Sequence, residues 1–512
     1  MTQPVNRLAL LAAVLTLTTA AGRGDTPPNP PLGLNLGGVT DYSSELVFVD
    51  AFKAARAWIS QAKGKPWGKG GPLDVDSRGN VRALADGQFA ETVVWTGFED
   101  RYPAGRFVCL YDGNGDVDIV SDARVTERQP GRLEVEVKPR SGSAFLRITR
   151  TDPKDPVRNI RLVPVEREKT YRDRPFRDDF LRRWRGFRVF RFMDWQRTNG
   201  SPLVEWADRP TPTDHSQAIK GVALEYMIDL CNTLKVDPWF CLPHRASDDF
   251  VRQFAAMVKE RLDPARTVYI EYSNECWNGQ FAQARYCAEQ GRKLGLSTNA
   301  FEAQLRYYSK RSVEIFAIWE DVFGGKKRLV RVLATQSANP WTGTTVLDWK
   351  SAHRHADAVA IAPYFGHHFG SPKTAEQVAE MSTDALVETL AKDVAANVKI
   401  VRSYAEVARK RGVQLVAYEG GQHLAGFHGA ENNDRLTRLF HAANRHPRMK
   451  DLYLTDLHNW RDAGGGLYCV FSSMGTYSKW GSWGVLEHMA QDPKRVPKMQ
   501  AIEQFLAESA RR

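Results

Sequence analysis

Two glutamates, each ending an apolar, β-branched run, are the residues of this chain best placed to do chemistry. Residues 267–278 read TVYIEYSNECWN and place Glu275 directly after Asn274, and residues 414–423 read QLVAYEGGQH and contain Glu419. A pair of carboxylates can supply the proton donor and the nucleophile that cleavage of a glycosidic bond requires. Because single acidic residues at strand ends often cap helices or pair with arginine, the prediction depends on the two occurring together.

Both glutamates belong to a long alternation of strand-like and helix-like segments. Besides the runs that end at the two glutamates, strand-like runs occupy residues 33–37, 187–193, 238–243, 329–334, 358–364 and 466–471. Helical spacing occupies residues 48–58, 218–235, 248–262, 300–323, 396–411 and 433–446. This alternation predicts an α/β fold, a (β/α)8 TIM barrel, whose catalytic groups lie at the carboxyl ends of the strands.

A different pattern between residues 70 and 164 indicates a second domain. Short alternating runs separated by Gly and Asp turns predict a small antiparallel β-sandwich. We therefore expect a first βα unit at residues 32–69, the inserted sandwich at 70–164 and the remainder of the barrel at 165–512. Its aromatics Trp95, Phe98 and Tyr102 offer no evident flat platform, which favours a packing module over a glycan-binding module.

The order and spacing of the two motifs resemble those of the retaining glycosidases of clan A. In that clan, the first Glu follows an Asn at the end of strand 4, and the second Glu ends strand 7. The resemblance covers most of the chain from about residue 170 onward, and a first strand near residue 33. It implies that Glu275 is the acid/base, that Glu419 is the nucleophile and that Asn274 binds the 2-hydroxyl of the sugar.

The same resemblance implies roles for residues at three other strand ends. Tyr364, which ends strand 6, matches the tyrosine that hydrogen-bonds the nucleophile. Arg191 on strand 2 matches the arginine that pairs near the nucleophile, with Arg188 as the alternative. The clan usually places a tryptophan at the end of strand 8, beneath the sugar that is cleaved, and either Trp480 or Trp483 could supply it.

Four further residues are expected to bind substrate because of their position at strand ends. They are Asn35 on strand 1 near the barrel mouth, Asp194 and Trp195 after strand 2, and His244 after strand 3. Tryptophan suits this role because pyranose rings present apolar faces to indole rings. Glu271 shares the alternation of Glu275 but lies one layer deeper in the barrel, so we interpret it as a structural acid paired with a buried arginine.

The composition excludes some classes of function. The formal net charge is +11, but no basic tract with interleaved aromatics predicts nucleic-acid binding. Two interpretations of the positive charge remain: it keeps the protein soluble, or it attracts an acidic glycan. The chain carries no metal-ligand spacing: residues 112–118 begin like a calcium loop but lack its later ligands, and the pair His367 and His368 has no matching third ligand. We expect no metal and no organic cofactor.

The first residues and the cysteines bear on the cell compartment. Residues 1–21 resemble a signal peptide and residues 22–31 a Pro-rich linker. No segment reaches transmembrane length, so we expect a secreted or periplasmic protein without membrane insertion.

An exported chain with six cysteines permits disulfides. Small buried hydrophobes are the favoured interpretation, with a bridge between Cys231 and Cys241 left open.

Taken together, these features predict a secreted retaining β-glycosidase. Its partner would be a polysaccharide or oligosaccharide of the β-glucan, xylan or mannan type. The alternatives are a non-catalytic carbohydrate-binding protein of the cell envelope and a transglycosidase that uses the same glutamates. The sequence does not specify the oligomeric state.

Overall fold

The computed structural model describes residues 31–97, 101–140 and 142–510. The expected signal peptide and nearly all of the expected linker lie outside these residues. Within them, no helix has the length and the apolar character needed to span a membrane.

Eight parallel strands close into a barrel, which confirms the predicted fold class. Their order around the barrel follows their order in the chain, with the last strand pairing the first. They are β1 (Leu32–Asn35), β12 (Val189–Arg191), β13 (Asp237–Leu242), β14 (Val268–Tyr272), β15 (Leu329–Ala334), β16 (Ala358–Ile361), β17 (Gln414–Ala417) and β18 (Tyr468–Val470). Because all the strands run in one direction, the residues that follow them meet at one mouth.

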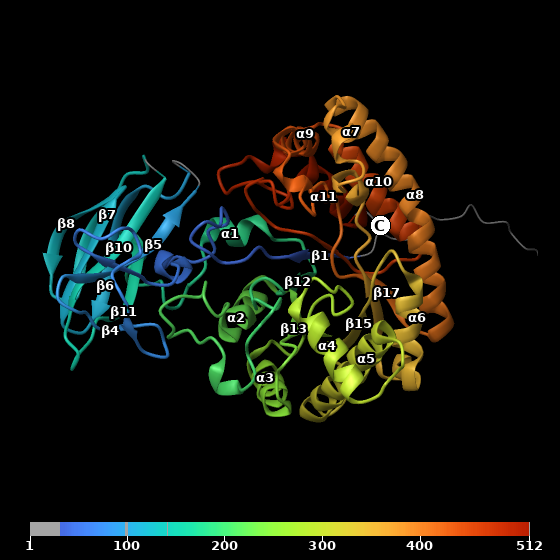
Figure 1. Cartoon of the computed structure of the whole chain (residues 1–512), viewed down its shortest axis with the longest axis horizontal. Coiled ribbons are helices and arrows are strands. Elements are labelled where there is room, and N and C mark those ends of the chain that lie inside the picture. The colour runs from blue at the N-terminus through green and yellow to red at the C-terminus, as the bar shows by residue number, and fades with distance from the viewer. Residues whose placement is uncertain (1–30, 98–100, 141, 511–512) are drawn as a thin grey trace, which may run out of the picture.

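Helices follow the strands and surround the barrel (Figure 1). They are α1 (Asp178–Arg183), α2 (Leu224–Leu234), α3 (Asp248–Arg261), α4 (Ala282–Lys293), α5 (Ala300–Phe323), α6 (Pro340–Asp348), α7 (Ala375–Ala379), α8 (Thr383–Arg411), α9 (Asp434–Arg445), α10 (Met449–Asp462) and α11 (Pro497–Ala510). The longest, α8, is capped at its start by the Ser382 hydroxyl, which accepts the Ala385 N–H. It ends at Gly412, whose φ of 67° suits glycine.

An antiparallel β-sandwich lies to one side of the barrel, beside α1 and α2 (Figure 1). One sheet has the order β2-β5-β10-β7 and the other the order β11-β6-β9-β8, with a separate β3–β4 hairpin. The strands are β2 (Ile59–Ala62), β3 (Asp74–Val75), β4 (Val81–Ala83), β5 (Gln88–Thr96), β6 (Gly105–Asp112), β7 (Gly115–Ser121), β8 (Ala123–Gln129), β9 (Arg132–Val137), β10 (Ser143–Thr151) and β11 (Arg158–Pro164). The sandwich has a hydrophobic core of its own.

The insertion begins earlier than the sequence predicts. The expected helix over residues 48–58 is wrong: only Ala51–Ala54 form a helical turn, of the 3-10 type. Residues 59–62, which the sequence assigns to the first βα unit of the barrel, pair with β5 as an edge strand of the sandwich. Trp95 and Tyr102 stack on each other at 5.3 Å and are both 3% exposed, so they belong to the sandwich core.

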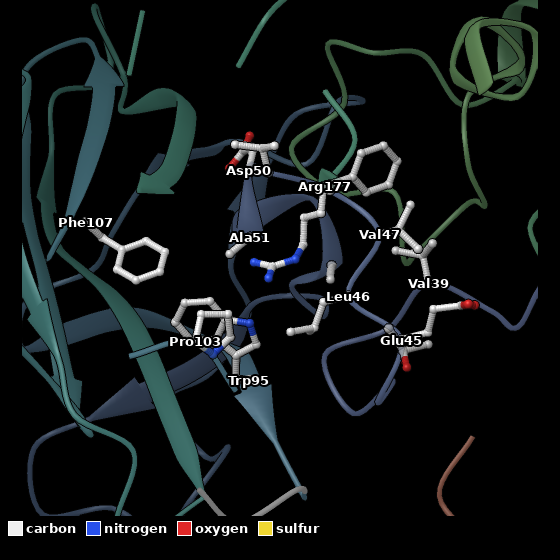
Figure 2. A pocket seen from close by; sticks show the side chains of 14 residues that line it. Val39, Glu45, Leu46, Val47, Asp50, Ala51, Trp95, Pro103, Phe107 and Arg177 are labelled. Atoms are coloured by element: carbon white, nitrogen blue, oxygen red, sulfur yellow. The ribbon is translucent and has the colours of Figure 1, made fainter. Parts of the chain in front are cut away.

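The two domains meet closely (Figure 2). Trp95 and Phe107 of the sandwich face Leu46, Val47 and Arg177 across a void of only about 20 Å³, little more than the ~10–15 Å³ that one water requires. The junction is therefore packed.

Hydrogen bonds fix the chain after β1 to the chain after β18. Glu45 accepts a 2.7 Å hydrogen bond from the Ser473 hydroxyl, which itself accepts the Gly37 N–H at 2.9 Å. Burial raises the pKa of Glu45 to about 7. These bonds hold together two of the loops that border the barrel mouth.

The six cysteines are all buried and all free. The bridge between Cys231 and Cys241 that the sequence left open is therefore absent. Both thiols lie in the hydrophobic core of the barrel, which agrees with their interpretation as small apolar side chains.

Candidate active site

The barrel places the two glutamates at its mouth, on the turns that follow β14 and β17. The chain leaves β14 through Ser273 and Glu275, both of which have left-handed backbone (φ of 59° and 43°). Residues other than glycine rarely adopt this conformation, and such strained positions cluster at functional sites. The turn points Glu275 toward the residues that follow β17, where Glu419 lies.

Arg191, the last residue of β12, joins four strand ends. Its guanidinium is 0% exposed. It donates to Glu419 Oε1 at 2.8 Å, to Asn274 Oδ1 at 2.8 Å, to Asn35 Oδ1 at 3.1 Å and to Glu271 Oε2 at 2.9 Å through Nη2 and 3.0 Å through Nε. All five N–H donors of a guanidinium are thus engaged.

This arrangement agrees with two expectations. Arg191 pairs with Glu419, as the arginine that it resembles pairs near the nucleophile. Because Arg191 has no donor left for a ligand, it positions the residues around it and does not bind substrate directly. The alternative, Arg188, pairs with Asp237 instead. The pairing of Glu271 with a buried arginine is confirmed, and Glu271 also accepts the indole N–H of Trp239 at 2.9 Å.

Glu419 is held by one donor on each oxygen. Arg191 binds Oε1, and the Tyr364 hydroxyl donates to Oε2 at 2.9 Å. The side chain is 7% exposed. A cation and a hydroxyl donor both stabilise the ionised form of a carboxylate, and they fix its orientation. The structure therefore brings Tyr364 to the position that the sequence resemblance implies.

Glu275 has the opposite electrostatic character. Burial and the negative charge of Glu419 raise the pKa of its carboxyl to about 7. Two donors partly offset this effect: Asn278 donates to Oε2 at 2.9 Å and the Tyr418 hydroxyl to Oε1 at 3.1 Å. Near neutral pH, Glu275 is therefore poised to carry a proton beside a carboxyl whose two oxygens both accept hydrogen bonds.

A chain of amides fixes Asn274. Its Oδ1 accepts from Arg191, and its Nδ2 donates to Asn199 Oδ1 at 3.0 Å. Gln283 of α4 donates to the same Asn199 oxygen at 2.6 Å and to the Asn274 carbonyl at 2.8 Å. The Asn274 amide thus has a fixed orientation and retains one N–H for a ligand.

Of the two candidate tryptophans after β18, the structure brings Trp483 to the site. Its half-buried ring packs against Tyr364 at 5.9 Å and His423 at 4.7 Å. Trp480 is 65% exposed and carries Lys479 over its ring. Gly481 has a φ of 131°, and a Cβ there would meet Trp483 Nε1 at 2.2 Å, so this turn requires glycine.

The backbone on both sides of Trp483 is fixed from beneath. The buried ammonium of Lys498 on α11 donates to the Ser482 carbonyl at 2.7 Å and the Gly484 carbonyl at 2.9 Å. Gln422 donates to the same Ser482 carbonyl at 2.8 Å. Burial lowers the pKa of Lys498. These hydrogen bonds therefore fix the loop that carries the Trp483 ring.

The other predicted site residues take different positions. The Asn35 amide lies beneath the site and is used by Arg191, the Tyr418 carbonyl and the Val470 carbonyl. The expectation for Trp195 is corrected: its ring is 0% exposed and donates its N–H to the Gly37 carbonyl, so it packs in the core and cannot stack on a sugar.

His244 and Asp194 also differ in their surroundings. The His244 ring is 5% exposed and packs on Tyr286, and burial lowers its pKa to about 4. Within the described residues it has no hydrogen bond to either glutamate. Asp194 is partly exposed, and burial together with the charge of Glu419 raises its pKa to about 7.

Four residues of the site were not expected from the sequence: Tyr418, Asn278, Asn199 and Gln283. Asn278 lies within the quoted segment 267–278, and its spacing of three residues from Glu275 was the one available signal. The others meet their partners through contacts between distant parts of the chain.

His367 and His423 complete one wall of the mouth, with their Nδ1 atoms 3.2 Å apart. Burial lowers the pKa of both rings, that of His423 to about 3, so both are neutral near pH 7. Among the described residues, no group of three or more His, Cys, Asp or Glu side chains could hold a metal ion.

Comparisons with known proteins find similar structures but no matching sequence family. No family model and no curated protein matches the chain. A GH51 arabinofuranosidase from Xanthomonas axonopodis pv. citri is similar at 11% identity and a TM-score of 0.38, over 59% of this chain and 61% of that one, which is less than two thirds of its length. An endo-β-1,4-mannanase from Thermotoga petrophila is similar at 13% identity and a TM-score of 0.34, over 64% and 72%. A GH5-4 broad-specificity endoglucanase from Clostridium acetobutylicum is similar at 12% identity and a TM-score of 0.34, over 62% and 86%.

Proposed function

We propose that this protein is an exported retaining β-glycosidase of the clan A type that hydrolyses a polysaccharide such as a β-glucan, xylan or mannan. The observation that carries the proposal is the contrast between its two glutamates. Glu419 is bound by a guanidinium and a hydroxyl, whereas Glu275 beside it has a pKa raised to about 7. A protonated acid beside a second carboxyl that is fixed in orientation is what retaining glycoside hydrolysis needs.

In the first step, a Glu419 oxygen forms a bond to the anomeric carbon. The bond between that carbon and the leaving oxygen breaks, and Glu275 gives its proton to that oxygen. The Asn274 N–H that remains free can donate to a hydroxyl of the same sugar, and the Trp483 ring offers an apolar face beneath it.

In the second step, Glu275 takes a proton from water, and the water oxygen displaces Glu419 from the anomeric carbon. Glu275 can now act as a base because Glu419, esterified to the sugar, no longer carries the charge that raised its pKa. The two steps together retain the configuration at the anomeric carbon.

Reducing-end release from a polysaccharide panel tests the proposal with wild type, Glu419→Gln and Glu275→Gln. We expect release by wild type and a loss of at least about 10³-fold in each variant, since each removes a group used in the reaction itself. Wild-type activity in either variant contradicts the assignment.

A 2,4-dinitrophenyl glycoside separates the roles of the two glutamates, because its leaving group needs no proton. Glu275→Gln should still release a burst of the phenol, and Glu419→Gln should not.

Binding and product length, measured on the same polysaccharides, discriminate the alternatives. Binding without product in long incubations indicates a carbohydrate-binding protein, and products longer than the substrate indicate a transglycosidase.

A further inference from the structure

A pocket of about 510 Å³ lies between the sandwich and the barrel, beside α2. The two domains pack closely around Trp95, but here they leave an open space. The sandwich side contributes Lys53 and Arg161 to the lining, and α2 contributes Tyr226 and Asp229. Ligand sites commonly have volumes of ~300–1,000 Å³ and often lie at domain interfaces. The lining includes neither glutamate of the active site and none of the residues that hydrogen-bond them, so the pocket is separate from the barrel mouth.

Both signs of charge line this junction pocket in equal number. Its four basic side chains are Lys53, Arg161, Arg172 and Arg261, and four acidic side chains accompany them. Each of the first three uses only one or two of its N–H donors on the protein. Within the described residues, the Arg261 side chain uses none, and Arg161 Nε is buried without a partner. Donors for a ligand are therefore available.

Free acceptors line the same pocket. Asp50 is 6% exposed, and its Oδ1 accepts the backbone N–H groups of Phe52 and Leu162. Its Oδ2 has no partner among the described residues. On α2, the Asp229 carboxyl and the Tyr226 hydroxyl are half-buried, and neither makes a hydrogen bond in the part of the chain that the structure describes. Because buried polar groups are normally paired, unpaired groups that line a pocket call for an explanation such as a ligand.

A ligand rich in hydroxyl groups fits this lining. A hydroxyl can accept a hydrogen bond from a guanidinium and donate one to a carboxylate at the same time. A small anion would need an excess of cations, which the equal numbers do not provide. The partners just outside the lining keep this balance, since Arg209 pairs with Glu225 and Asp112 with Arg161. The ring of Tyr226 adds apolar surface for the C–H face of a sugar.

We propose that this junction pocket is a second, non-catalytic saccharide site, in which Asp229, Tyr226 and Arg161 hydrogen-bond a sugar chain held between the sandwich and the barrel. The choice of a saccharide rests on the glycosidase function proposed above, whereas the pocket itself does not. A chain bound there stays close to the barrel mouth without occupying it, which raises its effective concentration at the active site. The sandwich then contributes to binding through its junction with the barrel, although it offers no flat aromatic platform.

Calorimetric titration of the Glu419→Gln protein with β-1,4-linked hexasaccharides of glucose, mannose and xylose tests the site, because this variant should bind without turnover. We expect two binding events with at least one of these sugars. Adding Tyr226→Phe and Asp229→Ala should weaken one event by about 10–100-fold, the range for a lost hydrogen bond to a charged group, and leave the other unchanged. Asp86→Ala, at an exposed site on the sandwich, also removes a carboxyl and should change neither event. Unfolding midpoints of the variants verify that they fold.

Kinetics of the active enzyme separate the pocket from the barrel mouth. In a protein with both glutamates intact, Tyr226→Phe with Asp229→Ala should leave kcat/KM on a short aryl glycoside unchanged, because that substrate needs only the mouth. On the polysaccharide, the same double variant should raise KM by at least about 10-fold at unchanged kcat, because the second point of attachment is lost.

The outcomes distinguish this inference from the proposed function. A single binding event that the double variant leaves unchanged overturns the inference, even if wild type releases reducing ends and Glu419→Gln does not. Binding of inorganic phosphate that the double variant weakens, without a matching event for any sugar, overturns it in favour of an anion site. The absence of binding by any sugar overturns it as well. A pocket event in a protein that releases no ends from any polymer supports the second site and contradicts the glycosidase function.

Discussion

Removing the Tyr418 hydroxyl should move the activity of this protein toward higher pH. Tyr418 donates to Glu275 Oε1 at 3.1 Å, and this bond stabilises the ionised form of Glu275. In Tyr418→Phe the ring remains, together with its contact with the Arg191 guanidinium at 5.1 Å, and the hydroxyl alone is lost. Hydrogen bonds to charged groups contribute about 1.5–3 kcal/mol, and 1.36 kcal/mol corresponds to one pKa unit. Because the Asn278 bond remains, we expect the pKa of Glu275 to rise from about 7 by about one unit.

The assay is the pH dependence of kcat/KM on a substrate that wild type cleaves. The proton donor must be protonated, so activity falls as pH rises through the pKa of Glu275, and the alkaline limb should shift upward by about one unit in the variant. Tyr364→Phe is the matched control: it removes a hydroxyl bound to Glu419 and should reduce the rate without moving that limb. Asp194 also has a pKa of about 7, so both profiles are repeated with Asp194→Asn. A limb that stays in place, or shifts downward, refutes the assignment of Glu275 as the acid.

Two further predictions concern stability. Arg191→Met leaves the carboxyls of Glu271 and Glu419 buried without a cation, so the free energy of unfolding, measured with denaturant at pH 7, should fall by about 3–5 kcal/mol. Adding Glu271→Gln to this variant should recover part of the loss. A fall below about 1 kcal/mol contradicts the role of the arginine. Burial raises the pKa of Asp456 from 3.8 to about 7, so its folded form holds a proton that the unfolded chain releases above pH ~4. Its contribution to stability therefore falls between pH 4 and 7. Asp456→Asn can still accept the Tyr468 hydroxyl. Its free energy of unfolding, relative to that of wild type, should therefore rise over this pH range by up to about 4 kcal/mol. A difference between variant and wild type that is the same at pH 5 and pH 8 contradicts the argument.

The barrel and its two glutamates could be predicted because both follow from local patterns. Buried parallel strands produce apolar runs that can be recognised in a single sequence. The carboxyl ends of the strands of a closed barrel meet at one mouth regardless of the conformation of the loops. Glu271 could be separated from Glu275 by its position along the strand-like run, since it lies four residues earlier and therefore deeper in the barrel.

Contacts made by loops could not be predicted in this way. Tyr418 precedes Glu419, and strict alternation would direct it away from the mouth, yet its hydroxyl reaches Glu275. Trp195 follows a strand end as Asp194 does, but its ring turns into the core. The choice of Trp483 over Trp480 depends on bonds from Lys498 and Gln422, which lie 15 and 61 positions away in the sequence.

Burial explains how this site keeps a proton on Glu275 although a guanidinium lies close by. Burial is the largest influence on the pKa of the Glu275 carboxyl, and the negative charge of Glu419 is the next; both raise this pKa, whereas Arg191 lowers it by less. The arginine also binds Glu271 through two of its nitrogens, so its guanidinium is held in place by a second acid. Arg191 can therefore orient Glu419 while the buried surroundings of Glu275 keep that acid protonated near neutral pH.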